Sequence, residues 1–545
     1  MPKKVARKKP FSGKKKKEQL KQKRKGRAEA KKKKNSDNNN DNNTNNMKKN
    51  NSNNDKDNEQ RGSLKLVTSF GGTSVKNIDN RLATMMIRED DEVVRERRLK
   101  GSLPIDTTKQ GTIPKAIHKP LKQILFHPRR PKWSSNLSIH EVETNEKIQF
   151  DTWCSNIHSN FKPGDITPFE HNLEVWRQLW RVVEQSDIIL LTCDCRNPLF
   201  HISQSLIDEC LLLRKPVVII LTKTDLVPVA HVHNWMKHLK HLYPFVNIFP
   251  FSSRGILSEN DLNKLKGGVA SRRKLLKKKP NLQLSDKAVK TLLILCATIC
   301  NVDLLNDSEE EEEEEEEDYD DGNNKNNKNN KKKEGKKKLS IGLCGHPNTG
   351  KTSLLNAIVG RKVASVSRTA GHTKHLQHIP LEYPKGVYLI DCPGLIFPLE
   401  QPRFIGEVMG LYPIAQIREP FSAIRIVYEY LQLDRLYNVK KPDWYDACDT
   451  WSPEMLCEAL AEKKGYMLSR GGAPDIQRAG LEIMKDIVDG VVCMRFDPPK
   501  FSSFNSTIST TTESNTSIIN NNQQFTQQEI DDDIRNDEDM KFLLQ

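Results

Sequence analysis

The sequence predicts an α/β protein built on a doubly wound, mostly parallel sheet, with a helical region after it and polar tails. Three observations support this prediction. Apolar residues recur at helical spacing over 173–183, and an uninterrupted apolar run of strand length follows at 187–194. The same change of period recurs along the chain, with room for a crossover helix between successive apolar runs. One of these runs, 340–345, leads directly into a glycine-rich loop and a helix.

Composition limits the classes of partner and compartment. The 545 residues are only 36% hydrophobic and carry a formal net charge of +16, which favours a polyanionic partner, RNA ahead of DNA or a membrane. No apolar run approaches the roughly 20 residues of a membrane span, and no signal peptide is recognisable. We therefore expect an intracellular monomer that does not contact membranes. The 11 cysteines lack paired spacing, which favours buried free thiols over zinc or disulfides.

Low-complexity segments mark the expected domain boundaries. The basic run that opens the chain is a nucleic-acid contact, a nuclear-targeting signal, both of these, or a solubilising tail, and the sequence does not separate these readings. The predicted organisation is a basic and then Asn-rich disordered tail at 1–60, a leader packed on the next domain at 61–165, an α/β domain at 166–402 with a disordered Glu/Asn/Lys insertion at 305–338, a helical C-terminal domain at 403–500 and a disordered tail at 501–545.

The elements follow in order within these boundaries. A helix is expected at 138–153 in the leader. Buried strands are expected at 187–194, 216–225, 246–253, 340–345 and 386–391. After Pro398 the pattern is helical, and the only later apolar run of strand type is 491–496.

The loop after 340–345 fits the phosphate-binding pattern GxxxxGK[ST] in its required strand–loop–helix setting. Its glycines allow backbone amides to converge on phosphates, Lys351 is placed to reach the β- and γ-phosphates as a catalytic residue, and the Thr352 hydroxyl is placed to ligate Mg²⁺. The predicted nucleotide-binding residues here are Gly345, His346, Pro347, Asn348, Thr349, Gly350, Lys351, Thr352 and Ser353.

A second motif, DxxG, ends the strand 386–391. Asp391 is expected to hold Mg²⁺ through water, and the Gly394 amide to sense the γ-phosphate. Thr373, between the two motifs, is the candidate switch threonine for Mg²⁺ and γ-phosphate, the alternative being a plain loop hydroxyl. The predicted binding residues of this segment are Asp391, Cys392, Pro393, Gly394 and Leu395.

Base recognition is expected after the strand 216–225. The carboxylate of Asp225 can accept both N1–H and N2–H of guanine, whereas adenine offers no such pair, and the Lys223 stem would cover the purine. Thr222 stands where the related NKxD motif usually has Asn, which puts its contacts to the base or the phosphate loop in question. The predicted base-site residues are Thr222, Lys223, Thr224, Asp225, Ser252 and Ser253.

These motifs occur in the order base loops, phosphate loop, switch and DxxG, whereas Ras-like GTPases begin with the phosphate loop. The order is that of a circularly permuted GTPase domain, and the insertion at 305–338 falls at the junction that the permutation must create. The permutation also connects the switch region directly to the C-terminal domain. We therefore expect the C-terminal domain to sense the γ-phosphate.

At this point the chain resembles a known family. The permuted order, the residues Asp194, Arg196, Asn197 and Pro198, the Gly371–His372–Thr373 triplet and the segment 391–398 are similar to the circularly permuted GTPases that include bacterial YlqF and eukaryotic nucleolar relatives. Within that family the chain is most similar to the guanine nucleotide-binding protein-like 1 subfamily. The resemblance covers about residues 120–500 and implies GTP and GDP as ligands, slow GTP hydrolysis, association with pre-ribosomal RNA, and residence in the nucleus, nucleolus and cytoplasm.

One position argues for slow turnover. Leu395 follows DxxG, where Ras-like enzymes carry a glutamine that orients the attacking water.

Asn348 resembles the Asn of GTPases that use K⁺ in place of an arginine finger; it is either a K⁺ ligand or a residue that stabilises the loop. The sequence-based hypothesis is a slow Mg²⁺-dependent GTPase switch linked to RNA or ribosome assembly. The alternatives are a GTP-regulated binding protein with little or no hydrolysis and an RNA-tethering scaffold.

Overall fold

The computed structural model describes residues 66–68, 85–117, 119, 121–162, 164–254, 268–276, 282–302, 338–363, 377–445, 450–469 and 472–499. All of them belong to one compact unit, Leu64–Gln545. The basic and Asn-rich tail at 1–60, most of the insertion at 305–338, Thr373 and the tail at 501–545 lie outside the described residues.

A six-stranded sheet forms the centre of this unit, with the spatial order β5-β4-β3-β6-β8-β7. All neighbours are parallel except β7 and β8. The strands are β3 (Ile188–Asp194), β4 (Val217–Thr222), β5 (Asn247–Pro250), β6 (Leu339–Cys344), β7 (Gln377–Pro380) and β8 (Val387–Asp391). The predicted α/β class and the mostly parallel sheet are confirmed, and all five predicted strands are present. β5 differs in burial, because only Phe249 of its four residues is buried.

The sheet order shows the permutation. β6, which precedes the phosphate loop, lies between β3 and β8, and Leu190 of β3 pairs with Leu343 of β6. β3 is the first strand of this sheet along the chain. It is therefore a neighbour of β6, whose counterpart comes first in an ordinary GTPase sequence. Because parallel strands share one carboxyl edge, the base loops after β4 and β5 and the phosphate loop after β6 emerge at the same edge.

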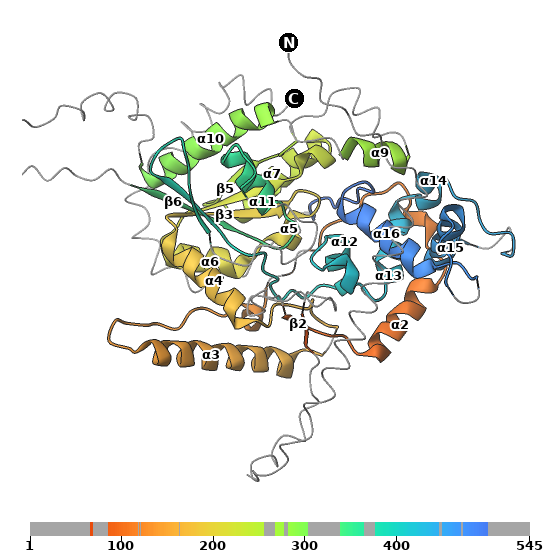
Figure 1. The fold of residues 1–545 in the computed structure, drawn as a ribbon, viewed down its shortest axis with the longest axis horizontal. Coiled ribbons are helices and arrows are strands. Elements are labelled where there is room, and N and C mark those ends of the chain that lie inside the picture. The colour runs from red at the N-terminus through yellow and green to blue at the C-terminus, as the bar shows by residue number, and fades with distance from the viewer. Residues whose placement is uncertain are drawn as a thin grey trace, which may run out of the picture. The chain divides into compact units, whose positions relative to one another are not determined.

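Both faces of the sheet are covered because successive side chains of each strand point to opposite sides. In β3, Ile189 and Leu191 join one apolar core, while Ile188 and Leu190 join the other. Figure 1 shows helices on both sides of the sheet. The helices of this region are α4 (Leu173–Gln185), α5 (Pro198–His201), α6 (Gln204–Leu212), α7 (Val229–Leu242), α10 (Leu282–Cys300) and α11 (Lys351–Ile358).

The C-terminal region is helical, as expected from the sequence. It contains α12 (Arg403–Val408), α13 (Phe421–Tyr430), α14 (Leu433–Tyr437), α15 (Pro453–Lys464) and α16 (Ile476–Val488). The helix α9 (Val269–Leu276) reaches it through ion pairs of Arg273 with Asp486 and Glu482. Its core is continuous with one core of the sheet.

The leader contacts both regions. Its helix α2 (Asp91–Ser102) packs on α13, and its strands β1 (Leu66–Thr68) and β2 (Met85–Ile87) pair antiparallel. The predicted helix at 138–153 is α3 (Ile139–Asn160), which begins with a capping box between Ser138 and Glu141. It runs past the predicted end because its sequence has no Pro or Gly before Pro163.

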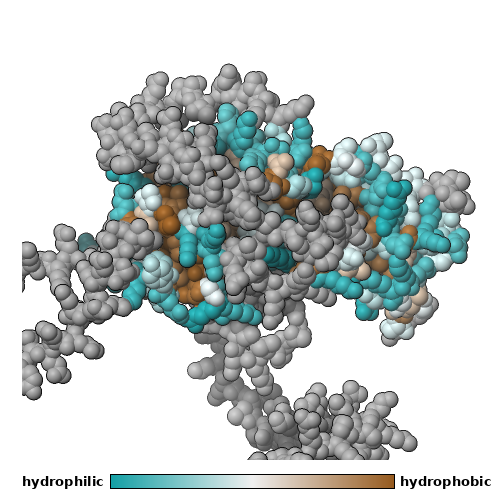
Figure 2. Space-filling view, turned by 90° about the horizontal axis from the view of Figure 1, so that it is seen from above, coloured by the Kyte–Doolittle hydropathy of each residue, from teal (hydrophilic) through white to brown (hydrophobic). Residues whose placement is uncertain are grey.

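Two elements differ from the prediction. The run 491–496 is buried but is not a strand, because its amides pair with separate segments: Val492 donates to Asp486 and Phe496 donates to Arg196. The edge strand β7 was not predicted because it is short, polar and ends at Pro380. The coloured surface seen in Figure 2 is largely polar, with apolar areas on the left and near the upper centre. No described helix has both the length and the apolar character that a membrane crossing requires.

The sheet packs closely against α4 at Gly342 of β6. A Cβ there would lie 2.4 Å from Ser186 Oγ and 2.9 Å from Val182 Cγ1. We predict that Gly342→Ala lowers the free energy of unfolding by about 1–3 kcal/mol, because the added methyl overpacks a buried interface. Urea unfolding measures the change. Gly268→Ala is the matched control, since within the described part of the chain a Cβ there meets only Leu436 O at 3.4 Å; an equal loss in both variants would contradict the packing account.

Candidate nucleotide-binding site

The phosphate loop connects β6 to α11, as the sequence predicted. Gly345, Asn348 and Gly350 all have positive φ (139°, 58° and 98°), so the loop curls before α11 begins at Lys351. Lys351 is buried, and its Nζ donates to the carbonyls of Gly345 and His346 at 2.8 and 2.6 Å. Burial lowers the pKa of Lys351, and the charge of Asp391 opposes that shift. The lysine is thus held along the inside of the loop.

Two further loop residues serve as anchors. His346 is fully buried, packs edge-on against Phe397 with ring centroids 5.3 Å apart, and has neither ring nitrogen hydrogen-bonded within the described part of the chain. Burial lowers the pKa of His346 well below its usual value, so the ring is neutral. Pro347 lies against the DxxG segment. Their backbones shape the loop while their side chains face the protein. Thr352 and Ser353 are half-buried in the first turn of α11.

Threonine hydroxyls tie the base loop to the phosphate loop. Thr222 Oγ1 lies 2.5 Å from the carbonyl of Thr349 and 3.0 Å from that of Cys193. The hydroxyls of Thr349 and Thr192 are 2.7 Å apart. Thr222 stands where the related motif usually has Asn. Its hydroxyl nevertheless contacts the phosphate loop, at the Thr349 carbonyl. Thr192 was not predicted, and only its place on β3 beside β6 could have suggested it.

The DxxG segment lies against the phosphate loop. Asp391 ends β8, and both of its carboxylate oxygens are buried without a hydrogen-bond partner among the described residues. Burial raises the pKa of Asp391 to about 6, although the charge of Lys351 opposes the shift. An orphaned carboxylate beside the phosphate loop fits a hydrated Mg²⁺, which favours oxygen ligands. Thr352 is the other described residue predicted to hold the ion.

The close approach of the two segments requires glycine at position 394. A Cβ on Gly394 would lie 2.9 Å from Pro347 Cα, and the next amide, of Leu395, donates to Gly345 O at 3.3 Å. The Leu395 side chain is buried in the apolar core. Cys392 and Pro393 are also buried. None of these side chains can align a water molecule.

The two base loops meet at Asp225. Ser252 Oγ donates to Asp225 Oδ1 at 3.0 Å, and Arg254 Nη1 lies 3.7 Å from Oδ2. Burial raises the pKa of Asp225, while Arg254 and Ser252 oppose the shift. Thr224 and Ser253 are half-buried nearby in the same two loops. The predicted base-site residues are thus brought together at the carboxyl edge.

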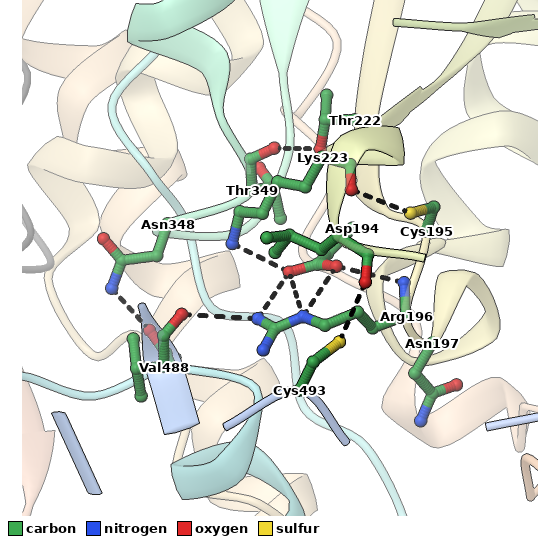
Figure 3. A network of polar contacts seen from close by, with 12 residues as sticks. Asp194, Cys195, Arg196, Asn197, Thr222, Lys223, Asn348, Thr349, Val488 and Cys493 are labelled. Carbon is green, nitrogen blue, oxygen red and sulfur yellow. Dashed lines mark hydrogen bonds and ion pairs between the residues drawn. The ribbon is translucent and has the colours of Figure 1, made fainter. Parts of the chain in front are cut away.

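Lys223 forms an ion pair with the buried carboxylate of Asp194. It has φ of 58°, and its Nζ lies 2.7 Å from Asp194 Oδ2. Asp194 also pairs with Arg196 at 2.7 Å, as Figure 3 shows. The sequence singled out the cluster of Asp194 and Arg196 but gave no partner for it.

Asn348 faces the C-terminal region. Its Nδ2 donates to the carbonyl of Gly410 at 2.7 Å, an interaction that crosses from the phosphate loop to the residues after α12. The predicted switch residue Thr373 lies outside the described residues, so the structure assigns it no place.

Comparison with known proteins gives the family. A family profile described as 50S ribosome-binding GTPase matches residues 340–425. Guanine nucleotide-binding protein-like 1 of Mus musculus is 33% identical over 418 residues, which cover 72% of this chain and 68% of that protein. The Homo sapiens protein of the same name is 33% identical over 420 residues, with the same coverage.

The chain belongs to the guanine nucleotide-binding protein-like 1 family of GTPases. GTPase LSG1-1 of Arabidopsis thaliana is also similar, at 30% identity over 71% of this chain and 70% of that protein. Among solved structures, the GNP-bound YlqF from T. maritima covers 59% of this chain and 97% of its own, with 16% identity and a TM-score of 0.34. Membership of the family agrees with the resemblance that the motifs and their permuted order indicated.

The hydroxyl of Thr222 provides a test of how this family member holds its phosphate loop. We predict that Thr222→Val weakens GDP binding about tenfold, because the isosteric change leaves the buried Thr349 carbonyl without its donor. Thr222→Ser keeps the hydroxyl and should bind GDP as the wild type does. Titration with a fluorescent GDP measures both. Equal affinity of the Val and Ser variants would show that the contact does not shape the site.

Proposed function

We propose that the protein is a slow Mg²⁺-dependent GTPase switch that converts GTP to GDP and phosphate and acts in RNA or ribosome assembly. The observation that carries the proposal is the contact between the base loop and the phosphate loop through Thr222 and Thr349. It brings the guanine-selecting carboxylate and the phosphate-binding lysine to one edge of the sheet. The intact set of Asp225, Lys351 and Asp391 argues against a scaffold with a vestigial site.

The residue roles form part of this proposal. Asp225 accepts from N1–H and N2–H of guanine, Lys351 reaches the β- and γ-phosphates, and Thr352 and Asp391 hold Mg²⁺, the Asp through water. Thr373 is assigned the switch role and Gly394 the γ-phosphate contact, as their motifs imply. When bound, Mg²⁺ neutralises charge on the phosphates. The remaining residues of the phosphate loop and of the loops after β4 and β5 orient the nucleotide.

Guanine selection is the part most directly open to test. We predict that Asp225→Asn weakens GDP binding about 100-fold or more, because one acceptor oxygen is replaced by an NH2 group that faces the N2–H donor of guanine, and the remaining acceptor loses its charge. The same variant should gain affinity for xanthosine diphosphate, whose O2 can accept from the new amide while the amide oxygen accepts from N1–H. Competition titrations with GDP, XDP and ADP measure this. Wild-type binding of ADP as tight as that of GDP would refute the assignment of Asp225.

Hydrolysis is expected to be slow without assistance because Leu395 cannot orient water. We propose that Asn348 binds K⁺ through Oδ1, since its Nδ2 already donates a hydrogen bond to the Gly410 carbonyl. The prediction is that single-turnover phosphate release is faster in KCl than in NaCl, and that Asn348→Ser loses the difference. If that variant instead binds GDP more weakly and equally so in both salts, Asn348 is a loop-stabilising residue. If no phosphate is released under any condition, ribosomal particles included, the protein is a GTP-regulated binding protein with no hydrolysis.

Ribosomal particles or their RNA are the proposed partners. The relative named GTPase LSG1-1 and the profile described as 50S ribosome-binding GTPase support this, as does the density of lysine in residues 1–34. Such a partner places the protein in the nucleus, nucleolus and cytoplasm, and we propose that it acts as a monomer.

The role of the tail can be separated from that of the nucleotide site. We predict that deleting residues 1–34 leaves GDP affinity unchanged but abolishes most RNA binding, and flattens its dependence on salt concentration, because phosphate contacts release counterions. RNA titrations at several KCl concentrations measure the slope. Unchanged RNA affinity after the deletion would place the RNA contact elsewhere in the chain.

A further inference from the structure

Asp194 ends β3 and is contacted by cations from two directions. Lys223 Nζ and Arg196 Nη2 both lie 2.7 Å from Oδ2, and Arg196 Nε lies 3.1 Å from Oδ1. Burial alone would raise the pKa of Asp194, but the charges of Arg196 and Lys223 hold that pKa well below its usual range. The Asp194 carboxylate therefore stays ionised. Its negative charge pairs with both Lys223 and Arg196, and this ion pair holds Lys223 in place (Figure 3).

Arg196 also reaches the C-terminal region. Its Nη1 donates to the carbonyl of Ile487 at 2.8 Å and its Nη2 lies 3.4 Å from that of Val488. These carbonyls belong to the last turn of α16, where the helix dipole is negative and carbonyls lack the amide donor of a following helical turn. The Ile487 carbonyl also accepts from the Gly490 amide at 3.1 Å. Arg196 has 0% of its surface exposed. The buried guanidinium of Arg196 thus donates both to the Asp194 carboxylate and to backbone carbonyls at the end of α16.

The end of α16 also packs closely on the base loop and on Gly410, which in turn contacts the phosphate loop. Gly490 has φ of 80°, and a Cβ there would lie 2.5 Å from Leu226, the neighbour of Asp225. Cys493 donates to the carbonyl of the same Leu226 at 3.3 Å. On the phosphate side, Val488 lies against Gly410, the residue that accepts from Asn348. Such packing leaves little room for α16 to shift without moving the two loops.

We propose that Arg196 is a positioning residue that makes guanine binding and docking of the C-terminal end of α16 mutually stabilising. The inference rests on the proposed contact of Lys223 and Asp225 with the base. By linkage, whatever free energy docking adds to nucleotide binding, nucleotide binding adds to docking. Lys223 lies at the base rather than at the γ-phosphate. Helix α16 therefore responds to occupancy by any guanine nucleotide, GDP as well as GTP, in addition to the γ-phosphate route through Gly394.

Hydrogen exchange of the full chain, with and without saturating Mg²⁺-GDP, tests this together with GDP titration. In the wild type, GDP slows exchange of the amides at 483–494. Arg196→Gln is expected to bind GDP about tenfold more weakly, within the usual range of coupling energies, and to lose the GDP-dependent slowing even at saturation. A role in stability alone would change exchange equally with and without nucleotide.

The matched control is Arg273→Gln, which removes ion pairs from α9 to Asp486 and Glu482 of the same helix. It should speed exchange in both states but keep GDP affinity and the GDP-dependent slowing. Gly490→Ala tests the docking of the same helix end without altering Arg196, because its Cβ would meet Leu226 at 2.5 Å and its φ of 80° disfavours alanine. It should reproduce the loss seen in Arg196→Gln.

The outcomes separate the two levels of proposal. A wild type that binds GDP without slowing exchange at 483–494 overturns the coupling and leaves the proposed function intact. The coupling is also overturned if a folded Arg196→Gln variant keeps wild-type GDP affinity and the GDP-dependent slowing. If Arg196→Gln does not fold, the same two readings in Gly490→Ala decide the question. A wild type that does not bind GDP at all refutes the proposed function instead.

Discussion

A carboxylate buried at the carboxyl end of a central strand has to be paired with cations, and three distant parts of the chain meet around Asp194 for this reason. Removing either partner of a buried ion pair leaves an uncompensated charge, which is strongly destabilising. Arg196 comes from the turn after β3 and Lys223 from the turn after β4. Arg196 also donates to the backbone carbonyl of Ile487 in α16. The base loop and the C-terminal helices are therefore positioned by the same charge.

The phosphate side of the site is held by uncharged groups instead. The hydroxyls of Thr192, Thr222 and Thr349 link β3, β4 and the loop after β6. In the sheet β3 lies between β4 and β6, although β4 and β5 lie between β3 and β6 along the chain. Short side chains suffice because parallel strands bring their carboxyl ends together. The permuted chain order changes which segments are joined covalently but leaves these neighbours unchanged. Gly394 against Pro347 adds the DxxG segment to the same assembly.

The sequence predicted what depends on local pattern. The buried strands follow from apolar runs and the phosphate loop from its glycines and Lys351, whereas guanine selection by Asp225 stays a prediction. It did not predict β7, whose pairing comes from its neighbour β8 rather than from its own residues, and it assigned a strand run to 491–496, whose amides bond to scattered partners. The contact of Arg196 with Ile487 was equally inaccessible, because backbone carbonyls at a helix end leave no mark in the sequence.

A crystal structure of the full chain with Mg²⁺-GDP would test the central claim most directly, because it locates the base and the ion pairs in one experiment. The account predicts that both Asp225 carboxylate oxygens face N1–H and N2–H of guanine, that the Lys223 stem covers the ring, and that Asp194 still joins Lys223 to Arg196 and α16. A nucleotide bound with its base away from Asp225, or a Lys223 separated from Asp194 with α16 unmoved, would contradict it.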